Sequence, residues 1–319
     1  MLLKYKNEID HHLELFIDQL PNLSIYDPIK YIVKLGGKRF RSSLVLLASD
    51  LYGAQPLAAI NEAIAIELFH NFTLIHDDIM DDAPLRRGEK SVHNKWTSDI
   101  AILSGDLLYA LVNKILAKSQ SNVIHCLFHQ TAIEVCEGQS LDMEFEGELD
   151  ITIDQYIQMI KLKTAVLVGS SLKIGSLIGK SDQINAQLMY DFGLFLGISF
   201  QIHDDILDVY PMGETFGKQI GGDILEKKKT VLLIELFSNF SRDEKLRFVS
   251  MLDNAQINNK DKVKEAKSLY SQYNVLEKAE DLKNDYFKKS LDCIEQLTLE
   301  ENKKKQLFDF AHKLMNREN

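Results

Sequence analysis

The stretch Ile60–Asp81, INEAIAIELFHNFTLIHDDIMD, decides the fold class. Its apolar residues recur every three or four positions, which is the period of an α-helix, and they do not alternate as in a half-buried β-strand. The same period runs through Met189–Asp208, Ala101–Leu116 and Thr131–Phe145. No proline occurs from Leu85 to Tyr210, so nothing forces a break in these helices. The patterns predict an all-α fold.

Length and composition limit the architecture and the class of partner. No flexible linker or change of composition divides the 319 residues, so we predict a single all-helical domain over residues 1–319. The formal net charge of −10 disfavours nucleic acid and anionic membrane surfaces as partners. The polar segment Met1–Asp10 lacks the features of a signal peptide, and no apolar run approaches the roughly 20 residues needed to cross a bilayer. We therefore expect no membrane span and a cytoplasmic location.

An acidic hexapeptide occurs twice in the chain. HDDIMD at residues 76–81 reappears as HDDILD at residues 203–208, and each copy closes an apolar helical run. Residues four positions apart lie on one face of a helix. The aspartates that share a face are Asp77 with Asp81 and Asp204 with Asp208. The duplication predicts two helices that place matching ends side by side.

Two carboxylates one helical turn apart destabilise a bare helix unless a cation compensates for their repulsion. Ligands that are all carboxylates favour a hard cation, and Mg²⁺, which completes its shell with water and substrate phosphates, is the natural candidate. A solvated helix end is the alternative for either copy alone, and neither copy has the glycine turn of a calcium-binding loop. His76 and His203 precede the aspartates and are predicted to pack beneath them.

Clusters of cationic residues offer the charge that a phosphate-bearing substrate would need. In GGKRFR, at Gly36–Arg41, three cations follow two glycines at the start of a predicted helix. Arg86-Arg87-Gly88 follows the first acidic copy after a short turn, and its arginines can neutralise carboxylates or hold phosphates. Further donors stand at Lys163-Thr164, at Lys218 within Gly217–Asp223, and at Lys227–Lys229. Each cluster taken alone is also compatible with a solvated surface.

In their order, these motifs resemble those of the trans-isoprenyl diphosphate synthases, also called polyprenyl synthetases, of the short-chain farnesyl and geranylgeranyl type. The resemblance covers residues 35–233 and rests on GGKRFR (Gly36–Arg41), ELFHNFTLIHDDIMD (Glu67–Asp81), RRG (Arg86–Gly88), GQSLD (Gly138–Asp142), KT (Lys163-Thr164), FQIHDDILD (Phe200–Asp208) and GKQIGGD (Gly217–Asp223). It implies an isoprenoid-synthase-type helical bundle around a deep central cavity. It also implies that two copies of the chain form a homodimer. It also implies a prenyltransferase that uses Mg²⁺ to join isopentenyl diphosphate head to tail to dimethylallyl, geranyl or farnesyl diphosphate.

The resemblance further implies roles for individual residues. Asp77 and Asp81 would bind two Mg²⁺ ions and Asp204 a third, with Asp78 and Asp208 as supporting ligands. The allylic diphosphate would be held by Arg86, Lys163, Thr164, Gln201, Lys218 and Lys228, with Lys227 or Lys229 as alternatives to Lys228. Isopentenyl diphosphate would be held by Lys38, Arg41, His70 and Arg87. The released diphosphate, held near Lys163, Thr164 and Gln201, would take the proton that leaves the product.

Product length is expected to depend on the floor of the cavity. Phe72 lies five residues before Asp77, about 7.5 Å along the helix at about 1.5 Å per residue, and Phe69 lies one turn deeper. In the family a bulky residue at this place tends to stop elongation. Phe72, Phe69 and the small Thr73 therefore imply a C15 to C20 product, with geranylgeranyl favoured. The alternative is that both phenylalanines are ordinary core residues.

Other functions stay open at this point. A longer-chain polyprenyl diphosphate synthase would share all of these motifs. A terpene cyclase shares the aspartate-rich helix but would leave Lys38, Arg41 and Arg87 without a role. A metal phosphohydrolase would need more histidine ligands than His76 and His203. A non-catalytic subunit of a heteromeric synthase would be expected to lack one acidic copy, and both are intact.

Overall fold

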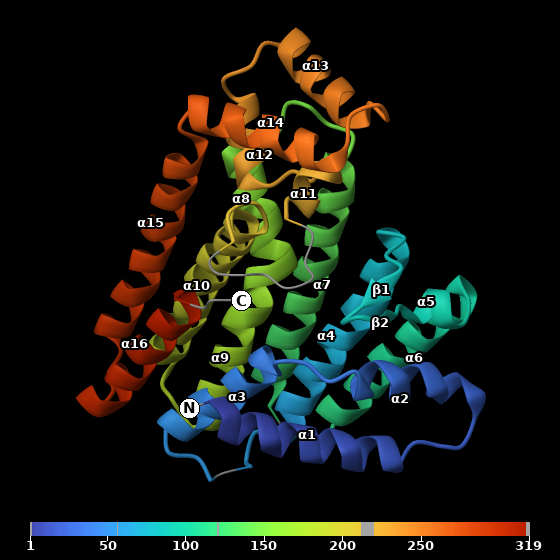
Figure 1. Cartoon of the computed structure of the whole chain (residues 1–319). Coiled ribbons are helices and arrows are strands. Elements are labelled where there is room, and N and C mark those ends of the chain that lie inside the picture. The colour runs from blue at the N-terminus through green and yellow to red at the C-terminus, as the bar shows by residue number, and fades with distance from the viewer. Residues whose placement is uncertain (1, 56, 120, 212–219, 317–319) are drawn as a thin grey trace. The chain divides into compact units, whose positions relative to one another are not determined.

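The computed structural model describes residues 2–55, 57–119, 121–211 and 220–316, most of which are helical (Figure 1). Within these ranges the only strands are the short β1 (Leu85–Arg86) and β2 (Glu89–Lys90), so the all-α prediction is confirmed. The chain packs as two compact units, Met1–Gln130 with Ser170–Tyr190, and Thr131–Gly169 with Asp191–Asn319. The single domain expected over residues 1–319 stays a prediction. No helix in the described ranges is long and apolar enough to cross a bilayer.

The helices follow one another with short connections. The first unit contains α1 (Leu2–Asp18), the 3₁₀ turn η1 (Ser24–Tyr26), α2 (Asp27–Lys34), α3 (Phe40–Leu51), α4 (Ile60–Met80), α5 (Val92–Lys95) and α6 (Ser98–Leu116). Three helices have a part in each unit: α7 (Asn122–Phe145), α9 (Val166–Ile178) and α10 (Gln183–Val209). The second unit also contains α8 (Ile153–Ile160), the π-helical turn η2 (Lys161–Ala165), α11 (Gly222–Leu225), α12 (Val231–Phe237), α13 (Arg242–Asp253), α14 (Asn259–Gln272), α15 (Val275–Gln296) and α16 (Glu301–Met315).

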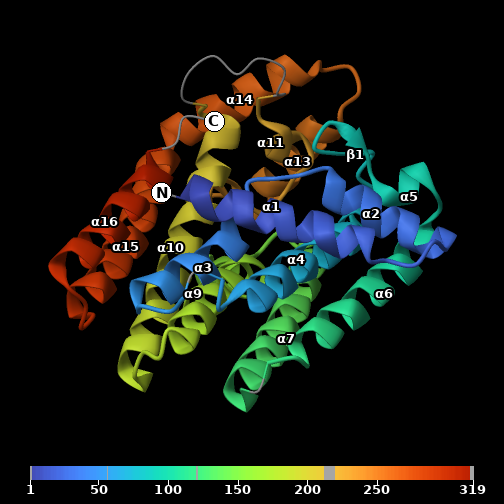
Figure 2. The same ribbon diagram turned by 90° about the horizontal axis from the view of Figure 1, so that it is seen from below.

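Helix α4 is the central helix of the first unit. It packs against α3 and α6, and α1 lies across α3 (Figure 2). The helix is apolar on nearly all sides, with Ile66, Leu68 and Phe69 fully buried, as expected of a helix surrounded by others. The predicted helix Ile60–Asp81 is one residue longer than α4. Because α4 packs against neighbouring helices, its C-terminal end, which carries the first acidic copy, is held in a fixed direction within the unit.

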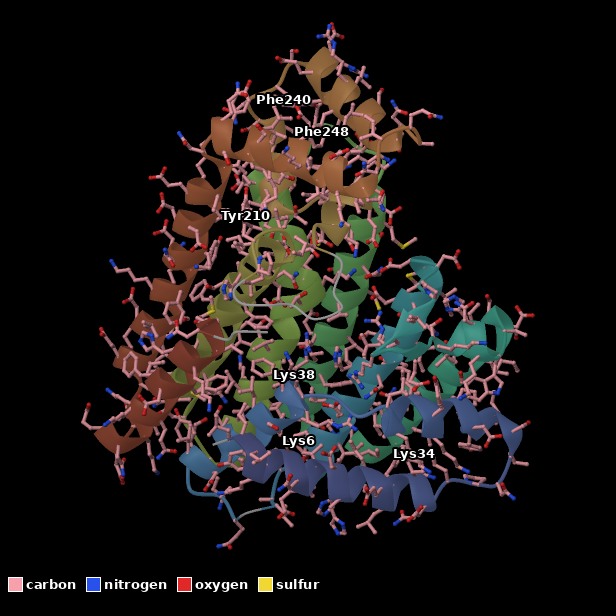
Figure 3. The ribbon with its side chains drawn as sticks, in the orientation of Figure 1. Lys6, Lys34, Lys38, Tyr210, Phe240 and Phe248 are labelled. Carbon is pink, nitrogen blue, oxygen red and sulfur yellow. The ribbon has the colours of Figure 1, made fainter. Side chains whose placement is uncertain are left out.

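In the second unit, side-chain caps define where two helices begin. Capping boxes start α8, with Thr152 and Gln155, and α13, with Ser241 and Glu244. The largely buried α12 packs against α15, and the rings of Phe240 and Phe248 lie together beyond its end (Figure 3). Helix α12 begins two residues after the last of the three consecutive lysines, so its burial anchors that segment.

Candidate active site

The first acidic cluster, defined as Asp77, Asp78 and Asp81, lies at the C-terminal end of α4. The backbone N–H of Asp81 donates to the carbonyl oxygen of Asp77 at 2.9 Å, so these two residues lie one helical turn apart on one side, as predicted. Asp77 is partly exposed and Asp81 exposed, whereas Asp78 is fully buried. Asp78 Oδ1 accepts hydrogen bonds from Arg86 Nε at 2.8 Å and from Arg86 Nη2. Burial raises the pKa of Asp78, although Arg86 acts in the opposite direction.

A tight hairpin presents the two arginines that follow this cluster. Its register pairs Arg86 with Glu89, which leaves Arg87 and Gly88 as the two turn residues. Both have positive φ, 56° and 81°, as a type I′ turn requires. Nη1 of Arg87 donates to the carbonyl oxygen of Gly36, so the turn brings Arg87 onto the GGKRFR segment.

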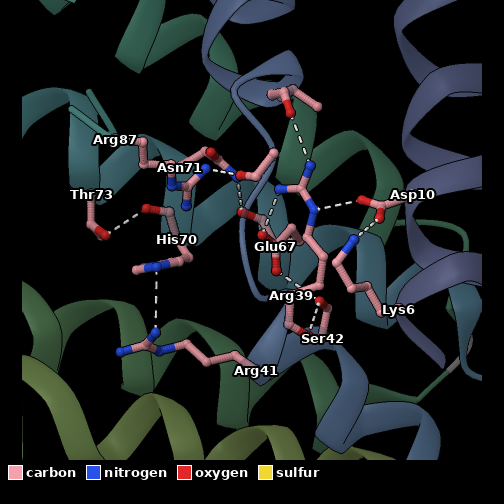
Figure 4. Close-up of polar contacts among 12 residues, drawn as sticks. Lys6, Asp10, Arg39, Arg41, Ser42, Glu67, His70, Asn71, Thr73 and Arg87 are labelled. Carbon is pink, nitrogen blue, oxygen red and sulfur yellow. Dashed lines mark hydrogen bonds and ion pairs between the residues drawn. The ribbon is translucent and has the colours of Figure 1, made fainter. Parts of the chain in front are cut away.

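Arginine side chains surround His70 on α4 (Figure 4). Nη1 of Arg41 lies 3.3 Å from Nε2 of His70. Desolvation, and then the charges of Arg41, Arg87 and Arg86, hold the pKa of His70 well below its usual value, so the ring stays neutral near pH 7. Desolvation, and then the charge of Arg39, lower the pKa of Arg87 as well. Cations that disfavour one another's charge in this way favour an anion as ligand.

Arg39, the middle cation of GGKRFR, is a buried structural residue that was not singled out from the sequence (Figure 4). Its Nε donates to Asp10 and its Nη1 to Glu67, both at 2.9 Å, while Nη2 donates to a backbone carbonyl at 2.9 Å. Its backbone φ of 49° is unusual for a residue other than glycine. Lys38 is exposed and Arg41 partly exposed. The ion pairs of Arg39 therefore anchor the GGKRFR segment, while Lys38 and Arg41 remain accessible to a ligand.

The second acidic cluster, defined as Asp204, Asp205 and Asp208, lies at the C-terminal end of α10, in the second unit. Asp204 is exposed, Asp208 is partly exposed and Asp205 is buried. Oδ2 of Asp208 accepts a hydrogen bond from the backbone N–H of Asp223 at 3.0 Å, which ties the start of α11 to the end of α10. Burial, and then the charge of Asp208, raise the pKa of Asp223 to about 6. The GKQIGGD segment is thus fastened to the second acidic cluster at its last residue.

Asp205, which the sequence did not single out, is the centre of a hydrogen-bond network. Its Oδ2 accepts from the hydroxyl of Tyr156 at 2.7 Å and from the backbone N–H of Val231 at 3.4 Å. Its Oδ1 accepts from Nε2 of Gln201 at 3.0 Å, and Oε1 of Gln201 accepts from the hydroxyl of Thr164 at 3.3 Å. Burial raises the pKa of Asp205 to about 7, while the donors Tyr156 and Gln201 act to lower it. The network joins the second acidic cluster to two predicted diphosphate ligands.

Lys163 and Thr164 lie on the π-helical turn η2 between α8 and α9. Such turns are rare and often occur at functional sites. Gly138 on α7 lies against this turn: a Cβ there would come within 2.6 Å of the carbonyl carbon of Leu162 and 2.7 Å of Cα of Lys163. Nζ of Lys163 pairs with Asp142 at 2.6 Å. The GQSLD segment therefore supports the KT pair through its glycine and its aspartate.

The three consecutive lysines have different partners. Lys227 pairs with a carboxylate of α13 at 2.6 Å, and Lys229 donates to a backbone carbonyl after α7 at 3.1 Å. Lys228 is exposed, and its Nζ lies 3.8 Å from Asp223, which is hydrogen-bonded to the second acidic cluster. Lys228 is therefore the lysine of the three that lies beside that cluster. Lys218, which the sequence also assigned to the site, lies outside the described residues.

An aromatic group lies among α4, α6 and the first part of α7. The centroid of the Phe72 ring lies 5.7 Å from that of Phe69, 5.3 Å from that of Tyr109 and 4.7 Å from that of His76. The fully buried Phe69 also packs against Phe128, with 5.2 Å between the two ring centroids. His76 packs against this group, as predicted. Tyr109 and Phe128 were not singled out because only the fold brings them to α4.

The donor set of the two clusters suits a hard divalent cation. The accessible carboxylates of each cluster offer oxygen ligands, which Mg²⁺ prefers. In the part of the chain that the structure describes, no group of three or more His, Cys, Asp or Glu side chains is gathered at metal-binding spacing. Mg²⁺ bound to one or two carboxylates usually completes its coordination with water and substrate phosphates. The clusters belong to different units, and their expected position side by side stays a prediction.

Known proteins resemble this chain over most of its length. The family model for polyprenyl synthetase matches residues 22–271. The chain is 34% identical over 301 residues to the short chain isoprenyl diphosphate synthase of Methanothermobacter thermautotrophicus, covering 93% of this chain and 92% of that protein. It is 43% identical over 238 residues to the geranylgeranyl diphosphate synthase of Saccharolobus solfataricus, covering 72% of each. The crystal structure of geranylgeranyl pyrophosphate synthetase from Pyrococcus horikoshii Ot3 matches with a TM-score of 0.90 at 32% identity, over 99% of this chain and 98% of that one.

Proposed function

We propose that the main product of this chain, which belongs to the polyprenyl synthetase family, is geranylgeranyl diphosphate. The chain is a short-chain trans-prenyl diphosphate synthase. In each cycle the C1–O bond of the allylic diphosphate breaks and diphosphate leaves. The C1 carbon then bonds to the double bond of isopentenyl diphosphate, and the adduct loses a proton. The observation that carries the diphosphate chemistry is the group of arginines around His70, next to the first acidic cluster. Cations for a diphosphate and carboxylates for a metal lie together there.

We propose that isopentenyl diphosphate binds at Lys38, Arg41, His70 and Arg87. Arg41 and His70 are within hydrogen-bond distance of each other, and Arg87 adds its positive charge to that of Arg41. Hydrogen bonds from guanidinium groups to phosphate are strong and directional. The neutral ring of His70 can donate a further hydrogen bond without adding to the repulsion among the arginines.

Replacing Gly37 by alanine is expected to raise the KM for isopentenyl diphosphate about 10-fold, with a smaller effect on kcat. A Cβ at Gly37 would lie 2.8 Å from Nη2 and 2.9 Å from Cζ of Arg87, so the guanidinium would have to move. Steady-state rates at varied isopentenyl diphosphate measure the change. Gly36→Ala is the matched control, because Gly36 also has a positive φ, 74°, but a Cβ there would meet nothing within 4 Å. An equal rise in KM for both variants would show that backbone strain is the cause.

The allylic diphosphate is proposed to be held by Arg86, Lys163, Thr164, Gln201, Lys218 and Lys228. Three Mg²⁺ ions, two at Asp77 and Asp81 and one at Asp204 with support from Asp208, would neutralise the leaving group when bound. Lys163 and Thr164 then retain the released diphosphate close to the adduct, so that one of its oxygens can take the proton. Apolar side chains along α4 exclude water, which would otherwise trap the allylic cation.

We further propose that the aromatic group sets product length. Phe72 and the small Thr73 are partly exposed, whereas Phe69 beneath them is fully buried. The hydroxyl of Thr73 donates to the carbonyl oxygen of His70 at 2.8 Å, which leaves its methyl group for apolar contact. The ring of Phe72 also packs against that of Tyr109. A growing chain that descends along α4 would therefore meet Phe72 first.

Replacing Phe72 by alanine is expected to lengthen the products by at least one five-carbon unit, because removal of the ring opens space along α4. Products are dephosphorylated and sized by chromatography. Phe240→Ala, which removes a ring from the aromatic contacts after α12, controls for a general loosening of packing. An unchanged product distribution in Phe72→Ala would contradict the role of Phe72 as the floor.

The proposed reaction is tested by incubation with Mg²⁺, isopentenyl diphosphate and each allylic primer in turn. Linear C20 alcohols after dephosphorylation are the expected result. Linear products beyond C20 would identify a longer-chain synthase, and cyclised hydrocarbons would identify a terpene cyclase. Release of phosphate without any new carbon–carbon bond would identify a phosphohydrolase.

We also propose that the enzyme is a homodimer. Ile102 and Leu103 on α6 are 47% and 54% exposed, and adjacent exposed apolar side chains are typical of surfaces that pair. Sedimentation equilibrium is expected to give twice the chain mass of 36.5 kDa. A single-chain mass at micromolar concentration would contradict this assembly.

A further inference from the structure

The second aspartate of each acidic cluster is the buried one. Asp78 is 0% and Asp205 is 6% exposed, whereas Asp81 and Asp204 are exposed. Successive residues of an α-helix are rotated by about 100° around its axis, so the second aspartate points to a different side from the first. The fifth residue of the motif returns to within about 40° of the first. The two copies therefore share a pattern in which one carboxylate faces into its own unit.

In the first cluster, the inward carboxylate holds Arg86. One oxygen, Oδ1, receives both Nε and Nη2 of the guanidinium, which fixes the plane of that group. The backbone N–H of Ala83 donates to the carbonyl oxygen of Asp78 at 2.9 Å, so the turn leading to Arg86 is tied to the same residue. Oδ2 of Asp78 is buried and has no hydrogen-bond partner among the described residues.

In the second cluster, the inward carboxylate holds Gln201. Both oxygens of Asp205 accept hydrogen bonds: Oδ1 from Gln201, and Oδ2 from Tyr156 and a backbone N–H. Nε2 of Gln201 donates to Oδ1 of Asp205, so the nitrogen end of the amide is the end that faces Asp205. The Oε1 end of Gln201 is thereby directed to the hydroxyl of Thr164.

We propose that Asp78 and Asp205 are positioning residues, which orient Arg86 and Gln201 for the allylic diphosphate and do not coordinate magnesium. The inference rests on the proposed function, because it assigns Arg86 and Gln201 to that substrate. It changes the role that the resemblance implies for Asp78, and it gives a role to Asp205. A carboxylate that turned outward to a metal would leave the donors that it now accepts from without this partner, which is unfavourable.

The test compares neighbouring aspartates within each copy. Asp78→Asn and Asp205→Asn are set beside Asp77→Asn and Asp204→Asn, and initial rates are measured against Mg²⁺ and against allylic diphosphate concentration. For Asp78→Asn and Asp205→Asn, kcat/KM for the allylic diphosphate is expected to fall about 10- to 100-fold, as it does when residues that orient ligand-binding groups are removed. The half-saturating Mg²⁺ concentration should change by less than about twofold, and excess Mg²⁺ should not restore the rate. For Asp77→Asn and Asp204→Asn the half-saturating Mg²⁺ concentration should rise.

A rise in the Mg²⁺ requirement of Asp78→Asn or Asp205→Asn as large as that of its neighbour would overturn the proposal for that residue. Tyr156→Phe provides a second variant, because it leaves Asp205 in place and removes one of its donors. It should lower kcat/KM for the allylic diphosphate without changing the KM for isopentenyl diphosphate or the Mg²⁺ requirement. An unchanged kcat/KM would contradict the network at Asp205. If the unmodified enzyme forms no prenyl diphosphate, the proposed function itself fails, whatever these variants do.

Discussion

Replacing Asp77 or Asp204 by alanine is expected to lower turnover by about 1,000-fold or more. The diphosphate leaving group carries growing negative charge as the C1–O bond breaks, and loss of a metal-binding carboxylate removes the cation that would neutralise it. Asp77 shares one side of α4 with Asp81, and Asp204 is exposed at the end of α10. Turnover is measured under saturating substrates and Mg²⁺, so that weakened binding alone does not account for the loss.

Asp82→Asn is the matched control for Asp77→Ala. Asp82 follows the first acidic cluster directly, its side chain is 100% exposed, and asparagine tolerates its positive φ of 46°. This variant should keep nearly all activity although it removes one negative charge from the same end of α4. Near-normal turnover by both Asp77→Ala and Asp204→Ala would refute the metal assignment.

Replacing Gly138 by alanine is expected to reduce kcat about 100-fold and to lower stability by about 1–3 kcal/mol. The added methyl group would press on the backbone of Leu162 and Lys163, and these atoms can move only if the π-helical turn changes shape. Displacement of the turn would shift Lys163 and Thr164 together, since both lie on it. Activity at saturating substrate and the midpoint of thermal unfolding measure the two effects.

Gly147→Ala is the control for this substitution. Gly147 is exposed, follows α7 closely, and a Cβ there would meet nothing within 4 Å. Its activity and unfolding midpoint should match those of the unmodified protein. If Gly138→Ala behaves like Gly147→Ala, the contact between GQSLD and the π-helical turn does not position the KT pair.

Much of the fold follows from patterns that are local in the sequence. The three- and four-residue period of apolar residues in Ile60–Asp81 predicts a helix. The structure has α4 there, and it ends within one residue of the expected place. The shared side of Asp77 and Asp81 follows from helix geometry alone. The proximity of Arg41 to His70 agrees with the role that the resemblance gives to both, although they are 29 residues apart.

Other features depend on contacts that a local pattern does not contain. Arg39 is one of three cations within four residues, and only the acid Glu67 within the apolar α4 indicated that one of them is buried. The π-helical turn that contains Lys163 cannot be recognised from its amino-acid composition, because the same residues also suit a regular helix. Asp205 could have been suspected from its four-residue spacing to Gln201, but its bond to Tyr156 links residues 49 positions apart.

The hydrogen-bonded turn Lys161–Ala165 contains one residue more than an ordinary α-helical turn. Each additional residue rotates the side chains that follow by about 100° from where an uninterrupted helix would put them. Deleting one residue here would allow regular backbone bonding to resume. The same deletion would swing the lysine away from Asp142 and the threonine away from Gln201. The resulting protein would have a more uniform helix without these two contacts, so we expect it to bind the allylic diphosphate more weakly.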